Sequence, residues 1–254
     1  MMKKTLIATA MLATTAAAQA EISGNVTMAS DYVFRGASQT DNQMALQGGF
    51  DYEHETGLYI GTWASNVDAD FFNTDGGHDP QLEVDLYAGY SSEFEGFGYD
   101  LGYLRYQYPG YSQAGTNEWY ASGSYSTGDF GDFSLSVNYS PTLNFWGSDQ
   151  SGWYWKAGYE TTLPWYEIGL SAHYGYSTGD AFDVDAGDIA KGDSGLADSY
   201  SDWSIGLSKS VFGVDLGITY TDLTDLKAYD EGVKEKCTSN WCDSKFVFSI
   251  SKSL

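Results

Sequence analysis

The amino-acid sequence predicts an all-β fold, a transmembrane antiparallel up-and-down β-barrel of about twelve strands. Segments of about ten residues alternate apolar and polar side chains, the pattern of strands with one apolar and one polar face. Long and short connections alternate between these segments, as in outer-membrane barrels. Aromatic residues make up 17% of the chain, with 21 Tyr and only 4 Pro, a composition that favours strands over helices.

The N-terminal segment has the features of a cleavable signal peptide. Lys3 and Lys4 form a short positive region, residues 6–13 form an apolar run too short to span a bilayer, and Ala18-Gln19-Ala20 is a small-residue cleavage site. We therefore expect a signal peptide over residues 1–20 and one barrel domain over residues 21–254. An uncleaved anchor is the alternative, but no stop-transfer pattern follows. No later apolar run reaches the roughly twenty residues of a transmembrane helix, so strands must make any crossing.

One predicted strand, residues 81–90, shows the alternation most clearly. One face carries leucine, valine, alanine and tyrosine, and the other carries Glu83 and Asp85, which need water or protein around them. Two further strands, near residues 58–66 and 99–108, carry apolar side chains on both faces, so their register stays open. Comparable alternating segments are expected at residues 22–34, 44–53, 133–139, 153–159, 168–174, 203–207, 214–220 and 246–250.

Connection lengths give independent support for a barrel, because outer-membrane barrels pair short periplasmic turns with long extracellular loops. The short links are expected at residues 54–57, 93–97, 127–129, 161–164 and 210–213. The long links are expected at residues 36–42, 68–79, 109–116, 141–150, 178–199 and 222–242. This order places both termini on the periplasmic side. A soluble β-sandwich is the alternative, but it explains neither the alternation nor the Tyr and Trp residues near predicted strand ends.

The charge balance points to cations as partners. The chain has 12 basic and 35 acidic residues, a formal net charge of −23. Nucleic-acid phosphates are held by clustered Lys and Arg, so we expect no nucleic-acid partner. Acidic loops that only keep an extracellular surface soluble are the alternative to ion binding.

Charged residues on the polar faces are the candidate pore lining. An excess of carboxylates around a pore favours cations. Arg105 is assigned to the lumen because arginine facing lipid near the midplane costs about 2–4 kcal/mol. The alternative is a network of ion pairs that plugs the barrel, as in eight-stranded barrels. The predicted pore-lining residues are Asp31, Arg35, Asp51, Glu83, Asp85, Arg105, Glu118, Lys156, Glu160, Glu167, Asp215 and Lys245.

Other reactive residues are few. Cys237 and Cys242 are the two cysteines, and in an exported protein they predict one short disulfide rather than a zinc site, which needs four ligands. The Asp-rich loop at residues 178–202 lacks the glycine and glutamate positions of a calcium loop, which favours a solvated loop. His173 is expected to face the lumen, without a serine arranged as a nucleophile. His78 lies in another Asp-rich loop. We therefore predict no catalytic residue, no metal site and no cofactor.

The segment Ser30-Asp31-Tyr32-Val33-Phe34-Arg35-Gly36-Ala37-Ser38-Gln39-Thr40 resembles the start of the TorF family of porin-like proteobacterial proteins. Further likeness lies at residues 59–67, 83–90 and 249–253. The resemblance implies an outer-membrane barrel with a pore and no settled substrate. It singles out Asp31 and Arg35, which we expect on one face of the first strand, about 13 Å apart.

The C-terminus departs from the usual pattern of outer-membrane barrels, which commonly finish with an aromatic residue. Here the last residue is Leu254, although Phe246, Phe248 and Ile250 share its alternating face. The departure weakens the argument from membrane insertion without removing the alternation on which the barrel rests.

Together these observations predict a porin-like channel in the outer membrane of a Gram-negative bacterium. Small cations or small polar solutes would pass through an acidic lumen, and the outer wall would contact the lipid bilayer and lipopolysaccharide. The alternative is a non-conducting barrel whose acidic loops bind a surface partner or divalent cations. The oligomeric state and the natural solute are left open.

Overall fold

The computed structural model describes residues 21–68, 80–144, 147–164, 166–183, 198–224, 226–230, 233–237 and 240–254. The expected signal peptide, His78 and residues 184–197 of the Asp-rich loop lie outside the described residues.

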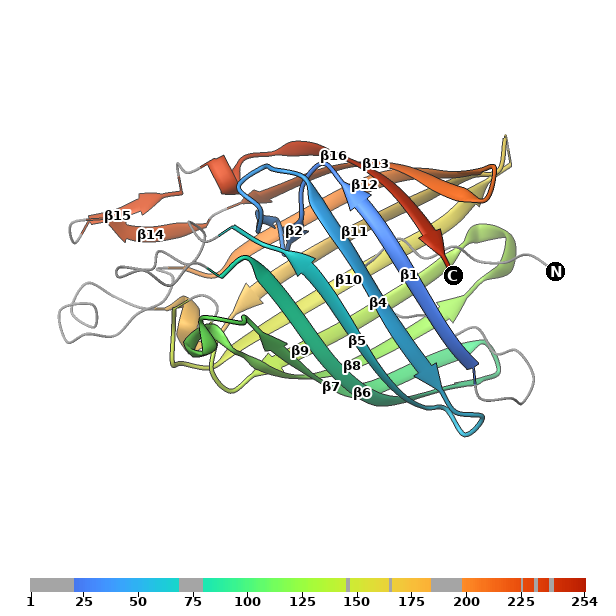
Figure 1. The fold of residues 1–254 in the computed structure, drawn as a ribbon, viewed down its shortest axis with the longest axis horizontal. Helices are drawn as coiled ribbons and strands as arrows, with labels where there is room; N and C mark the ends of the chain where they lie inside the picture. The colour runs from blue at the N-terminus through green and yellow to red at the C-terminus, as the bar shows by residue number, and fades with distance from the viewer. Residues whose placement is uncertain are drawn as a thin grey trace.

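Twelve strands of the described chain close into an antiparallel barrel (Figure 1), which confirms the predicted fold. Each strand pairs with its neighbour along the wall, and β1 closes the circle by pairing with β16. The wall consists of β1 (Glu21–Ala29), β4 (Ala45–Glu53), β5 (Leu58–Asn66), β6 (Leu82–Phe94), β7 (Phe97–Gln107), β8 (Asn117–Ser126), β9 (Asp132–Ser140), β10 (Gly152–Leu163), β11 (Ile168–Thr178), β12 (Tyr200–Val211), β13 (Val214–Thr224) and β16 (Lys245–Ser253).

Smaller elements lie in the connections. Two short antiparallel pairs are β2 (Val33–Phe34) with β3 (Ala37–Ser38), and β14 (Lys227–Asp230) with β15 (Val233–Lys236). The 3-10 helices are η2 (Ser112–Ala114), η3 (Gly128–Phe130), η5 (Asp180–Phe182) and η6 (Asn240–Cys242).

Long and short connections alternate around the barrel as expected, and they divide it into a loop end and a turn end. In Figure 1 the long connections with β2, β14 and β15 gather at the left, and the tight turns lie at the right. The start of β1 and the end of β16 lie toward the turn end. The loop end carries the long connections, and the turn end carries the short ones.

The two faces of the wall differ in chemistry. Outward side chains are apolar and largely exposed, for example Ile22 at 76% and Leu135 at 69%. Inward side chains include the buried carboxylates Glu83, Asp100 and Glu118. A continuous apolar belt of this kind is larger than monomeric soluble proteins expose, and it suits hydrocarbon.

The first strand is shorter than predicted. We expected a strand over residues 22–34, but β1 ends at Ala29, which pairs with Ala45 of β4. Residues 30–44 leave the wall, and Arg35 and Gly36 take φ values of 48° and 84°. This left-handed turn reverses the chain between β2 and β3, because extended strand geometry cannot continue through it.

Candidate functional site

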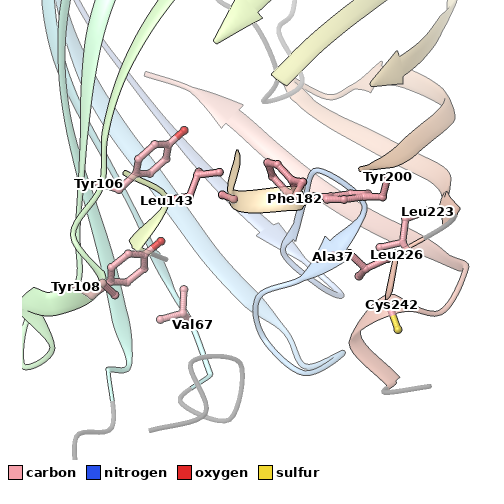
Figure 2. Packing of buried hydrophobic residues seen from close by; sticks show 12 residues of the cluster. Ala37, Val67, Tyr106, Tyr108, Leu143, Phe182, Tyr200, Leu223, Leu226 and Cys242 are labelled. Carbon is pink, nitrogen blue, oxygen red and sulfur yellow. The ribbon is translucent and has the colours of Figure 1, made fainter. Parts of the chain in front are cut away.

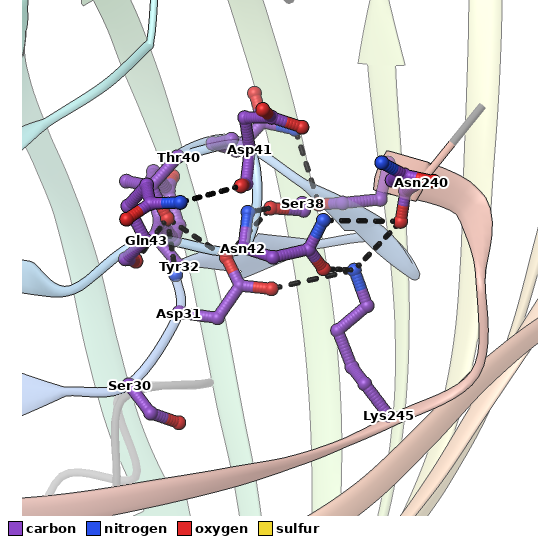
Figure 3. A network of polar contacts seen from close by, with 12 residues as sticks. Ser30, Asp31, Tyr32, Ser38, Thr40, Asp41, Asn42, Gln43, Asn240 and Lys245 are labelled. Atoms are coloured by element: carbon purple, nitrogen blue, oxygen red, sulfur yellow. Dashed lines mark hydrogen bonds and ion pairs between the residues drawn. The ribbon is translucent and has the colours of Figure 1, made fainter.

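The inward segment, residues 30–44, is the most distinctive feature of the lumen. Its shape is held by Asp31, whose Oδ1 accepts hydrogen bonds from Ser38 Oγ at 2.6 Å and Thr40 Oγ1 at 2.8 Å. Its Oδ2 lies 3.3 Å from Nζ of Lys245 on β16, and the same ammonium donates to Asn42 Oδ1 at 2.5 Å (Figure 3). Asp31 thus organises the segment and ties it to the wall.

The inward segment reaches opposite walls of the barrel. The hydroxyl of Tyr32 donates to Glu83 Oε1 on β6 at 2.8 Å. A Cβ placed on Gly36 would lie 2.8 Å from Cβ of Asp202 on β12, so the backbone there touches that strand. In the closed order of twelve strands, β6 and β12 are six positions apart, which makes them diametrically opposite. The segment therefore crosses the lumen from wall to wall near the loop end.

Arg35 projects from the tip of the inward segment into a buried ion pair. Its Nη2 lies 2.5 Å from Oε2 of Glu118 on β8, with side-chain exposures of 6% and 1%. Its guanidinium also lies over the ring of Tyr154, 4.3 Å from the centroid. Burial alone would lower the pKa of Arg35, but the carboxylate of Glu118 raises it, and the net pKa lies above its ordinary value. Arg35 is therefore a fixed positive charge.

The carboxylate of Glu118 is fully engaged. It accepts hydrogen bonds from Asn138 Nδ2 at 2.7 Å, Tyr106 Oη at 3.1 Å and Ser140 Oγ at 3.2 Å, besides the contact with Arg35. A buried ion pair tolerates desolvation only when the remaining lone pairs are satisfied in this way. These hydrogen bonds fix the carboxylate of Glu118 in the position where it pairs with Arg35.

A small apolar core closes around the inward segment at the loop end (Figure 2). Ala37 of the segment packs in it with Leu223 of β13, Leu226 and Cys242. The disulfide between Cys237 and Cys242 lies at the edge of this core, with an S–S distance of 1.98 Å. The inward segment therefore has apolar as well as ionic support.

Toward the turn end, lumenal tyrosines lie over glycines of neighbouring strands. A Cβ on Gly61 would meet the ring of Tyr87 at 2.2 Å, and one on Gly102 would meet the ring of Tyr120 at 2.3 Å. The hydroxyl of Tyr87 donates to Asp51 Oδ1 at 2.5 Å. A Cβ at either position would collide with the ring, so glycine allows these tyrosine rings to lie close against the wall.

Most predicted pore-lining residues lie on inward strand positions. The acidic members on these positions are Asp51, Glu83, Asp85, Glu118, Glu160 and Asp215. The basic members are Lys156 and Lys245. Asp31 and Arg35 also lie inside the barrel, but on the inward segment rather than on one face of the first strand.

The predicted position of Arg105 was wrong. Its neighbours Leu104 and Tyr106 face inward, so Arg105 faces outward, where its Nη1 donates to Asn117 Oδ1 at 3.0 Å. The argument from membrane cost fails here because Arg105 lies close to the loop end of β7. The cost of an outward arginine falls to about 0–1 kcal/mol near the interface.

The predicted position of Glu167 was also wrong. Glu167 lies exposed in the turn between β10 and β11, with φ 52°, and the preceding Tyr166 has φ 63°. Both residues take the left-handed conformation that reverses the chain there. Glu167 is therefore outside the lumen wall, at the rim of the turn end.

Sequence reasoning missed the partners of His173. Its Nε2 lies 2.8 Å from Asp202 Oδ1, and its Nδ1 lies 2.8 Å from Ser204 Oγ. All three face the lumen, brought together by the register that pairs His173 with Ser204. The trio resembles a hydrolytic set, but β12 is paired on both sides, so its backbone N–H groups serve the sheet rather than an oxyanion hole.

None of the helices in the described residues has the length and hydrophobicity that a bilayer crossing would require. No three His, Cys, Asp or Glu side chains in the described ranges are grouped so that they could hold a metal ion.

Solved structures with a similar fold include porins. The KdgM porin matches with a TM-score of 0.56 at 8% identity, over 91% of this chain and 99% of that chain. The KdgM porin in complex with disordered oligogalacturonate gives 0.55 at 9% identity, over 92% and 98%. The NanC porin gives 0.53 at 10% identity, over 91% and 98%. At these identities the likeness concerns the fold alone.

Sequence comparison places the chain in a family. No curated protein matches it. A family model described as "Bacterial protein of unknown function (Gcw_chp)" matches residues 13–254. With its twelve-stranded barrel and inward segment, the chain belongs to this Gcw_chp family of bacterial proteins of unknown function.

Proposed function

We propose that the protein is an outer-membrane porin-like channel that passes small cations or small polar solutes. One observation carries this proposal, the separation of charge between the two faces of the closed wall. Outward charged residues on the described barrel strands lie only near the ends of the barrel. Arg105 and Asp222 lie near the loop end, and Lys209 and Lys252 lie near the turn end. The remaining charges of these strands face inward, as a polar lumen in an apolar membrane requires.

The acidic excess of the lumen supports a preference for cations. Inward carboxylates occur from Glu83 near the loop end to Asp215 near the turn end, whereas the inward basic side chains on the described strands are Lys156 and Lys245. Such a field attracts cations and repels anions. A polyanion such as oligogalacturonate, which was found with KdgM, fits this lumen poorly.

The proposed location is the outer membrane of a Gram-negative bacterium, with both termini in the periplasm. The expected signal peptide would direct export, and long connections at one end suit the extracellular side. The outer wall would contact lipid, with lipopolysaccharide around the loop end. The resemblance of residues 30–40 to TorF porins points the same way.

A second candidate is a non-conducting barrel whose acidic loops bind a surface partner or divalent cations. The inward segment favours it, because a chain that crosses the lumen from β6 to β12 reduces the open cross-section. The pore-lining roles of the inward residues depend on which candidate holds.

Planar-bilayer recording separates the two candidates. The purified, folded protein should give discrete conductance steps, with a reversal potential in a KCl gradient that shows K⁺ favoured. The same recording is made on a variant in which residues 30–44 are replaced by a short turn. The channel proposal is lost if neither protein conducts, and cation preference is lost if the reversal potential shows Cl⁻ favoured.

A further inference from the structure

The inward segment is not needed to close the wall. Ala29 and Ala45, which flank it, are direct partners in the β1–β4 ladder. A two-residue hairpin would join them equally well. The fifteen residues between them are therefore an insertion into the lumen, supported by what they touch there rather than by the strands they connect.

Two ion pairs hold the segment at opposite points of the wall. Asp31 pairs with Lys245 on β16 at 3.3 Å, and Arg35 pairs with Glu118 on β8 at 2.5 Å. In the closed order, β16 and β8 are again six positions apart among twelve strands. The ion pairs therefore hold the segment to a second pair of opposite strands, β16 and β8, in addition to β6 and β12.

The two ion pairs differ in what their loss would do to the inward segment. Asp31 also bonds to Ser38 and Thr40 within the segment, so it maintains the fold of the segment itself. Arg35 lies at the turn between β2 and β3, and its ion pair is with the wall. Loss of the Arg35 contact would free the tip while the base stays folded.

From this arrangement we propose that the inward segment, residues 30–44, is a plug that restricts conduction, and that the ion pair between Arg35 and Glu118 is the latch that keeps it across the lumen. This inference rests on the proposed channel function and adds to it a closed state and the residue pair that controls it. Buried ion pairs are screened little by salt, so the latch should hold over ordinary ionic strengths.

The buried phenol of Tyr32 supports the closed arrangement. Burial raises its pKa well above the ordinary value, and the negative charge of Glu83 raises it further. Tyr32 therefore stays a neutral donor to Glu83 and adds a hydrogen bond between the plug and β6. The latch at Arg35 is then the ionic contact through which the tip of the plug is released.

The direct test compares single-channel conductance of the full chain with that of a plugless variant, in which Asn-Gly replaces residues 30–44. A difference in SDS-gel migration between unheated and boiled samples verifies that both barrels are folded. We expect the plugless variant to show a several-fold higher unitary conductance or open probability. Equal conductance of the two folded proteins would overturn the plug and leave the channel function standing. Absence of conduction in both would instead remove the channel function and the plug with it.

The latch is tested by charge exchange in the full chain. Glu118→Arg places two cations together and should raise conductance toward the plugless value, whereas the double variant Arg35→Glu/Glu118→Arg should return it toward that of the native protein. Asp222→Arg, on the outer face, is the matched control and should leave conductance unchanged. If Glu118→Arg does not fold, Arg35→Gln removes the same contact. A native conductance in a folded latch variant would contradict the assignment.

Discussion

The guanidinium Nη2 of Arg35 lies 2.5 Å from Oε2 of Glu118, although the two residues are 83 positions apart in the sequence. Arg35 belongs to the inward segment, which leaves the barrel wall between β1 and β4. Glu118 lies on β8, near the loop end of that strand. Through this contact, the connection between the adjacent strands β1 and β4 extends across the lumen to β8.

Removal of Arg35 should destabilise the barrel more than removal of both charges. Arg35→Met leaves the carboxylate of Glu118 buried without its counter-charge, at a cost of about 3–5 kcal/mol. Arg35→Met/Glu118→Gln removes both charges but keeps a side-chain oxygen that accepts from Asn138 and Tyr106, and it should recover most of that loss. Urea-dependent tryptophan fluorescence in lipid vesicles measures both. Equal losses in the single and double variants would show that packing, not charge, carries the contact.

Neutral substitutions in the lumen should weaken cation preference. Glu83→Gln with Asp85→Asn removes two inward carboxylates of β6 and should move the reversal potential in a KCl gradient toward zero. Asp222→Asn removes an acid on the outer face of β13 and serves as the control. Unchanged selectivity in the double variant would take these residues out of the pore lining.

The tolerance of outward positions to charge should depend on depth. Leu135 lies in the middle of β9 and is 69% exposed, and Phe94 ends β6 at the same exposure of 69%. Leu135→Arg should cost about 2–4 kcal/mol of stability, whereas Phe94→Arg should cost about 0–1 kcal/mol. Refolding titrations into vesicles give both values. Similar costs at the two positions would argue against a bilayer around this wall.

The glycine beneath Tyr120 should resist substitution. A Cβ on Gly102 would lie 2.3 Å from the ring of Tyr120, while a Cβ on Gly123 would lie 3.9 Å from the carbonyl oxygen of Gly98. Gly102→Ala should therefore push the ring into the lumen and destabilise the barrel by about 1–3 kcal/mol, while Gly123→Ala is tolerated. The two variants are compared in urea titrations. Equal stability would mean that the ring moves aside without cost.

Much of the barrel could be predicted because it depends on local patterns. Alternation of apolar and polar residues determines which side chains of a strand share a face, whatever its neighbours are. The segment at residues 81–90 therefore identified Glu83 and Asp85 as inward-facing. Turn residues and spacing likewise predicted six long and five short connections, because the chain must reverse after each crossing.

The tertiary structure alone decided the rest. The alternating residues 30–34 read as a continued strand, but in the structure they leave the wall and contact distant strands, as Tyr32 does with Glu83. Arg105 faces outward because the register of β7, not the cost of charge in lipid, fixed its face. The apposition of His173 and Ser204 follows from pairing between neighbouring strands. Contacts across a barrel depend on register and closure, which a single sequence does not encode locally.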